Sequence, residues 1–185
     1  MFVRVLGVLV MCGVVACDAN ETPKAVTPTS LPKADVFTTT RPDDAVGLAK
    51  VKMAAKAGDT VTFLARVGGK RTVFVDGSAI FLAADPELTS CELMGDEDHC
   101  TMPWDYCCED ADAMTAGLAT VRLVDDAGKV LKESADGKGG LEALKFVVVT
   151  GVVRERNDEG VFVVDASEIW VGGKPSRGDE LGGAY

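Results

Sequence analysis

The chain has 185 residues, a formal net charge of −10 and 47% hydrophobic residues, with six cysteines and one histidine. This length suits one domain with flexible ends, and the hydrophobic share is enough for a real core. A polyanionic partner requires clusters of Lys and Arg that displace counterions. The sequence has no such cluster, so nucleic acid and anionic lipid headgroups are not expected partners.

The first segment of the chain, MFVRVLGVLVMCGVVAC, is typical of an export signal. One basic residue, Arg4, precedes an apolar or small stretch that ends at Ala16 and is too short to span a bilayer as a mature helix. An ordinary cleaved signal and a core helix are the alternatives. The closing Val-Val-Ala-Cys resembles the lipobox of bacterial lipoproteins. This resemblance implies a signal peptide over residues 1–16, cleavage before Cys17 and acylation of the Cys17 thiol, which would anchor the mature chain in a lipid bilayer.

Residues 17–42 are expected to be the lipidated cysteine and a linker. From Asp18 to Pro42 the chain holds four of its seven prolines and six threonines. Such a segment cannot bury enough surface to offset its ordering entropy. Asp43 or Asp44 is then expected to cap a short helix that runs to about Lys56.

Strand signals dominate the remainder of the chain. After Gly58-Asp59 the apolar residues recur at every second position, as in a half-buried strand. Later strands are expected at 72–75 with 79–83, interrupted by a turn at 76–77, and at 120–131, turning at 125–128. Two more are expected at 146–153 and 161–171, with one helical turn at 141–144 and a hairpin turn at 157–160.

The order strand, strand, strand, short helix, strand, strand predicts a mainly β fold. It is the order of an OB-fold-like, five-stranded Greek-key barrel. The short helix lies between strands three and four, and a cysteine-rich loop lies between strands two and three. A small β-sandwich is the competing fold, disfavoured by the few strands and the single helix. The domain is expected over residues 43–171, and the Gly-rich tail at 172–185 is expected to be disordered.

Two sets of segments carry a resemblance to known proteins. The stretch GDTVTFLARVGG and the motif PWDYCC, Pro103 to Cys108, resemble an uncharacterised group of bacterial lipoproteins. The segments LEALKFVVVTGVV and GVFVVDASEIWV resemble the closing half of bacterial OB-fold-like exported proteins. The resemblance covers roughly residues 45–171. It supports the fold and implies no established activity.

Four cysteines remain after Cys12 leaves with the signal and Cys17 takes the lipid. An even number in an exported chain predicts a disulfide framework. A bond between the adjacent Cys107 and Cys108 would be strained. Two bridges are therefore expected, each joining Cys91 or Cys100 to one of the vicinal pair, and each contributing about 2–4 kcal/mol.

A metal site is the alternative use of the same segment. The one histidine, His99, lies among these cysteines, and thiolates with an imidazole suit zinc or copper. The candidate ligands are Cys91, His99, Cys100, Cys107 and Cys108. The spacing is not C-x-x-C, and an oxidising compartment disfavours free thiolates. A reactive vicinal pair ranks last, because its acidic neighbours disfavour thiolate formation.

Trp104 and Tyr106 are the candidate ligand contacts, although packing of the loop onto the barrel is the favoured role for both. No G-x-S-x-G, H-E-x-x-H or P-loop motif occurs, so an enzyme is not expected. The sequence predicts a membrane-anchored binding or structural module of the cell envelope that needs no cofactor. Its partner would be the bilayer, and then an envelope protein or glycan. An envelope metal-binding protein is the alternative function.

Overall fold

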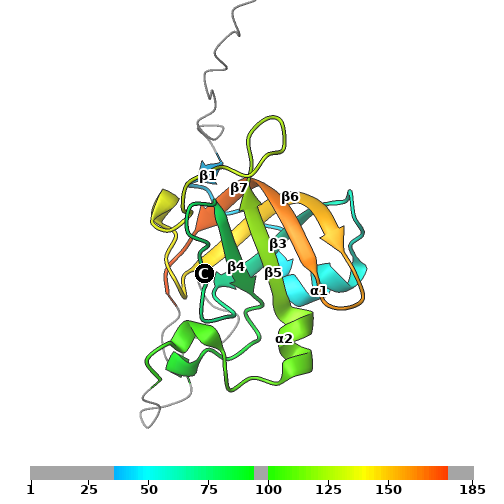
Figure 1. Ribbon diagram of the computed structural model, residues 1–185. Helices are drawn as coiled ribbons and strands as arrows, with labels where there is room; N and C mark the ends of the chain where they lie inside the picture. Colours follow the sequence, from blue (N-terminus) through cyan, green and yellow to red (C-terminus); the bar gives the residue numbers. More distant parts are fainter. Residues whose placement is uncertain (1–35, 94–99, 175–185) are drawn as a thin grey trace, which may run out of the picture.

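Five strands of the computed structural model close into a barrel; the structure describes residues 36–93 and 100–174 (Figure 1). They are β3 (Thr60–Val67), β4 (Ile80–Ala84), β5 (Leu118–Leu123), β6 (Phe146–Arg156) and β7 (Phe162–Val171). β3 pairs antiparallel with β4 and β6, and β4 pairs antiparallel with β5. β5 runs parallel to β7, and the antiparallel β6–β7 pair completes the circuit. The predicted OB-fold-like barrel is confirmed.

The remaining elements are short. β1 (Phe37–Thr38) runs parallel to β7, and β2 (Val46–Gly47) runs parallel to β3. The helices are α1 (Leu48–Ala54), α2 (Ala111–Gly117) and three single 3-10 turns, η1 (Cys91–Leu93), η2 (Pro103–Asp105) and η3 (Lys138–Gly140). β1 falls inside the predicted linker, so contact with the barrel begins before residue 42. No helix in the described ranges has the length and hydropathy needed to cross a membrane.

Alternating side chains from the five strands fill the barrel. In β3 the buried Phe63, Ala65 and Val67 point inward, and inward residues of the other strands complete one cluster. β6 is buried on both faces from Phe146 to Val149, as suits its continuous run of β-branched residues. Val147 and Val149 enter the barrel, while Val148 packs outside it with Phe146 and Leu64.

The segment expected as a strand at 72–75 forms only an isolated bridge, Phe74 opposite Phe81. Three further local expectations differ from the structure. The first helix is shorter than predicted, and neither Asp43 nor Asp44 caps it. Gly47 occupies its N-cap position, and the side chain of Asp85, which follows β4, accepts from the Ala49 N–H at 2.6 Å. The cap is therefore supplied by a residue distant in the sequence, which no local pattern can reveal.

The second difference is α2, which lies in the segment predicted to be loop. Asp110 caps α2 by accepting from the N–H groups of Asp112 and Ala113. The third concerns the connection from β5 to β6, where the helical element is the 3-10 turn η3. The expected helical turn at 141–144 is non-helical, with Leu144 at φ 72° and its N–H donating to the Val67 carbonyl at 2.7 Å.

Candidate functional site

The cysteine segment packs against the end of β3 through a buried arginine. Arg66 is 1% exposed, and its guanidinium lies over the ring of Tyr106, 5.3 Å from the centroid. It donates to the Ser90 hydroxyl at 3.1 Å and to the Pro86 and Leu88 carbonyls. Buried charges usually pair with an opposite charge. Arg66 makes no ion pair within the described part of the chain, and its Nε has no hydrogen-bond partner.

Three of the four cysteines that were expected to form disulfides or bind a metal come together. The sulfurs of Cys91, Cys100 and Cys107 all lie within 4.8 Å of one another. Cys91 is buried, Cys100 is half-buried and Cys107 is exposed, so the cluster reaches the surface on the Cys107 side. Cys108 is exposed and does not belong to the group. His99 lies outside the described residues.

The Cys91 and Cys107 sulfurs are 4.0 Å apart. This separation is about twice a disulfide bond, so the two residues are thiols here, and the predicted bridges remain a prediction. Burial, and then the hydrogen bonds to Cys100 and Cys107, raise the pKa of Cys91 to about 12. The neutral thiol is therefore the resting form of Cys91 near neutral pH.

Both candidate aromatic residues pack against the barrel instead of forming an open stacking platform. Tyr106 is 1% exposed, and its hydroxyl has no hydrogen-bond partner. Trp104 is half-buried against the core, with its Nε1 donating to the Arg71 carbonyl at 3.2 Å. A hollow of about 560 Å³ opens beside Tyr106 and Cys107, between Arg71 and Glu109. The hollow gives solvent access to the thiol cluster.

A groove of about 500 Å³ lies on the outer face of β4 and β5. Leu82 and Thr120 point into it because their neighbours along each strand point into the barrel core. α2 forms one wall, and the turn between β6 and β7 forms another. The lining is mainly aliphatic, with one cation and one carboxylate: Lys70, Leu82, Met114, Leu118, Thr120, Glu159, Val161 and Phe162.

Lys52 holds these walls in place. It lies on the buried face of α1, is 7% exposed, and donates at 2.7 Å to each of three carbonyls, those of Thr115, Leu118 and Gly160. The first two belong to the end of α2 and the start of β5, and the third to the β6–β7 turn. One ammonium group thus joins both sides of the groove to α1.

We expect Lys52 to make stability rise with pH. Burial, with a smaller contribution from Arg156, lowers its pKa from 10.5 to about 8. Between pH 8 and 10.5 the unfolded chain keeps a proton that the folded chain has lost. The free energy of unfolding therefore rises in this window, by at most about 1.4 kcal/mol per pH unit.

Urea unfolding of the wild type and Lys52→Met at several pH values would measure this slope. The difference between the two proteins isolates Lys52, because both keep the cysteines and tyrosines that also titrate at high pH. A difference that stays constant from pH 8 to 10 would contradict the assignment.

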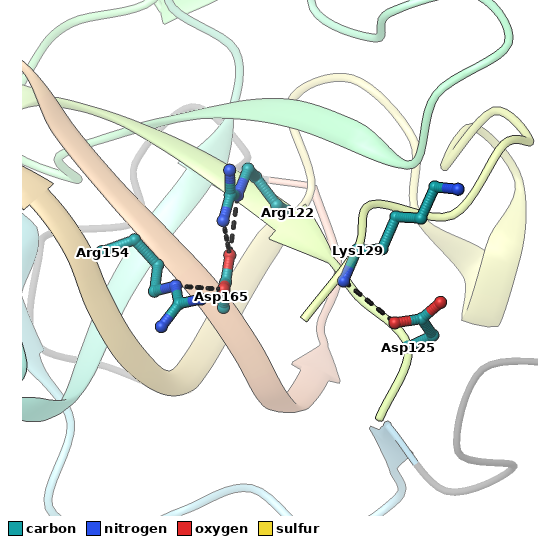
Figure 2. Close-up of polar contacts among 5 residues, drawn as sticks. All are labelled: Arg122, Asp125, Lys129, Arg154 and Asp165. Atoms are coloured by element: carbon teal, nitrogen blue, oxygen red, sulfur yellow. Dashed lines mark hydrogen bonds and ion pairs between the residues drawn. The ribbon is translucent and has the colours of Figure 1, made fainter. Parts of the chain in front are cut away.

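A carboxylate beyond the groove on the same outer face is fully paired (Figure 2). Asp165 on β7 is buried, and its Oδ1 lies 2.6 Å from Arg122 Nη2. Its Oδ2 lies 2.8 Å from Arg154 Nε. In the nearby turn, Asp125 accepts from the Lys129 backbone N–H at 2.9 Å. With both oxygens occupied by guanidinium groups, Asp165 joins three strands and is not free to act as a general base.

Sequence reasoning found the cysteines but missed Arg66 and Lys52, because a cation in a strand or helix carries no local sign that it is buried. Cys17 lies outside the described residues. Comparison of the chain with protein-family models, curated proteins and solved structures gives no match. The class of this protein therefore rests on its fold alone, an OB-fold-like barrel carrying a thiol cluster and an apolar groove.

Proposed function

We propose that this chain is a membrane-anchored lipoprotein of the bacterial cell envelope whose barrel is a non-enzymatic binding module. The apolar run that ends at Cys17 supports export and anchoring. The observation that carries the binding role is the groove over β4 and β5, the face that binds oligomeric ligands in other OB-folds.

The chemistry of the groove favours a protein segment as its occupant. Its lining is mostly aliphatic, and the one aromatic residue in it, Phe162, is buried. A glycan would need exposed rings for its sugar faces and several polar groups for its hydroxyls. Aliphatic side chains of an extended peptide would instead lose water on contact with Leu82, Met114 and Leu118.

Charge argues against nucleic acid as the ligand. Removal of residues 1–16 takes away Arg4 and no other charged residue, so the formal charge changes from −10 to −11. The groove lining itself offers only one cation, Lys70, balanced by Glu159. Phosphate neutralisation requires several cations along a track.

A photo-crosslinking amino acid at Thr120 tests the groove in living cells. We expect a discrete, protease-sensitive adduct from Thr120, and no adduct from the same group at Asp126, an exposed turn residue outside the groove. The substitution Met114→Glu should reduce the Thr120 adduct about tenfold or more, because removing a carboxylate from water under an aliphatic ligand costs about 1.4 kcal/mol or more.

Equal yields of adduct at Thr120 and Asp126 would contradict specific binding of a ligand in the groove. An adduct that glycosidases remove and proteases do not would show a glycan in place of the expected protein segment.

A further inference from the structure

The cysteine cluster has the dimensions of a metal-binding site. In a tetrahedral zinc site the metal–sulfur distance is about 2.3 Å, which places ligand sulfurs about 3.8 Å apart. Cys91 and Cys107 are already separated by 4.0 Å, and Cys100 lies within 4.8 Å of both. Movements of less than about 1 Å would therefore bring all three sulfurs to the ligand distances of one ion.

A disulfide framework explains this arrangement less well. One disulfide joins only two of the three sulfurs and leaves the third as a thiol beside it. The predicted second bridge needs Cys108, which is exposed and stands outside the cluster. Three converging sulfurs and one excluded neighbour are the pattern expected of ligands around a common centre.

A buried cation beside the cluster is the second observation. The guanidinium of Arg66 has only neutral hydrogen-bond acceptors, and two of its contacts immediately precede cysteines of the cluster. Ser90 precedes Cys91, and Tyr106 precedes Cys107. A buried charge is costly unless an opposite charge lies close by. The Glu92 carboxyl is near enough for the Arg66 charge to act on it, but the two groups form no ion pair. Three thiolates on a divalent ion carry one net negative charge, and three on a monovalent ion carry two.

We propose that Cys91, Cys100 and Cys107 bind one thiophilic metal ion, Zn²⁺ or Cu⁺, whose anionic thiolate shell is balanced by Arg66. Each thiol gives up its proton to the solvent when the ion binds. Among the described residues these three sulfurs form the ligand cluster, and Cys107 is the one of them that lines the hollow. The ion would enter through this hollow. The three cysteines do not line the groove, although the hollow and the groove share Lys70 and Met114.

Metal titration of the purified full chain, reduced and metal-free under anaerobic conditions, tests the site. We expect one Zn²⁺ or one Cu⁺ per chain by elemental analysis after gel filtration. With Co²⁺ as a probe, a thiolate-to-cobalt charge-transfer band should appear and saturate at one equivalent. Parallel titrations with Zn²⁺ and Cu⁺ identify which ion binds more tightly.

The vicinal cysteines provide a matched pair of variants. Cys107→Ser should weaken metal binding by more than about 100-fold, since a lost ligand costs more than the 10–100-fold typical of outer-shell changes. Cys108→Ser should change it by less than about twofold. The melting temperatures of the metal-free proteins show whether each variant folds, and Cys100→Ser replaces Cys107→Ser if that variant does not.

Three results would overturn the proposal. The first is that the reduced wild type binds none of the three ions, Zn²⁺, Cu⁺ and Co²⁺. The second is that Cys107→Ser and Cys108→Ser lose metal binding to the same extent. The third is a peptide map of the chain isolated from envelopes under non-reducing conditions that shows disulfides among these cysteines. The last result would establish the predicted disulfide framework in place of the metal site.

Discussion

Gly151→Ala should destabilise the barrel by about 3 kcal/mol or more, at the upper end of what overpacking costs. Gly151 lies in the middle of β6, at a register shift in its pairing with β7. A β-carbon there would stand 2.4 Å from the Asp165 carbonyl oxygen and 2.7 Å from Val164 Cγ1. Backbone atoms of a paired strand cannot move aside as a flexible side chain can, so β6 and β7 would have to separate.

The measurement is chemical and thermal unfolding of the wild type and the variant. A loss of this size should lower the melting temperature by roughly 10 °C. Gly173→Ala is the matched control, because Gly173 has no heavy atom within 4 Å of its added β-carbon and no positive φ. Equal stability of Gly151→Ala and the wild type would show that the strands are not in close contact at this position.

Cys17→Ser should remove the lipid anchor and move the protein out of the detergent phase. A serine hydroxyl cannot form the thioether that the lipobox resemblance implies. Burial of an acyl chain contributes about 0.8 kcal/mol per methylene, so its loss changes membrane partitioning by orders of magnitude. Detergent-phase partitioning, incorporation of labelled fatty acid and intact mass would measure the effect.

Cys12→Ser is the control for this experiment. Cys12 lies in the same apolar run but precedes the expected cleavage point, so its loss should leave lipidation unchanged. Unchanged fatty-acid incorporation in Cys17→Ser would refute anchoring at Cys17, and the binding role of the groove would then be tested separately by the crosslinking at Thr120.

The cysteine site shows which features of a site a local sequence pattern can predict and which it cannot. The spacing of Cys91, Cys100 and Cys107 marks the segment and favours two disulfides, with a metal site as the alternative, but it does not show which sulfurs meet. The convergence of three sulfurs and the exclusion of Cys108 depend on how η1 and η2 fold onto the barrel. The missed helix α2 did have a local sign, the Asp110 cap before an alanine-rich turn, but its short length gave no hydrophobic period.

The sequence by itself determined the five barrel strands, most of their turns and the class of fold. Alternation of apolar residues in β3 and the β-branched run in β6 are local properties, and they specify which faces must leave water. Residue order then leaves few ways to connect five such strands.

Only the tertiary structure decided the groups that cooperate across the chain. Asp85 caps a helix through an N–H group 36 residues away in the sequence. Lys52 donates to carbonyls 63 to 108 residues away, and Arg66 donates to a loop residue, Ser90, more than 20 residues away. Hydrogen bonds and charge balance act over a few ångströms, whatever the separation along the chain. Barrel closure brings these groups together, so their roles follow from the fold and are not visible in any segment of the sequence alone.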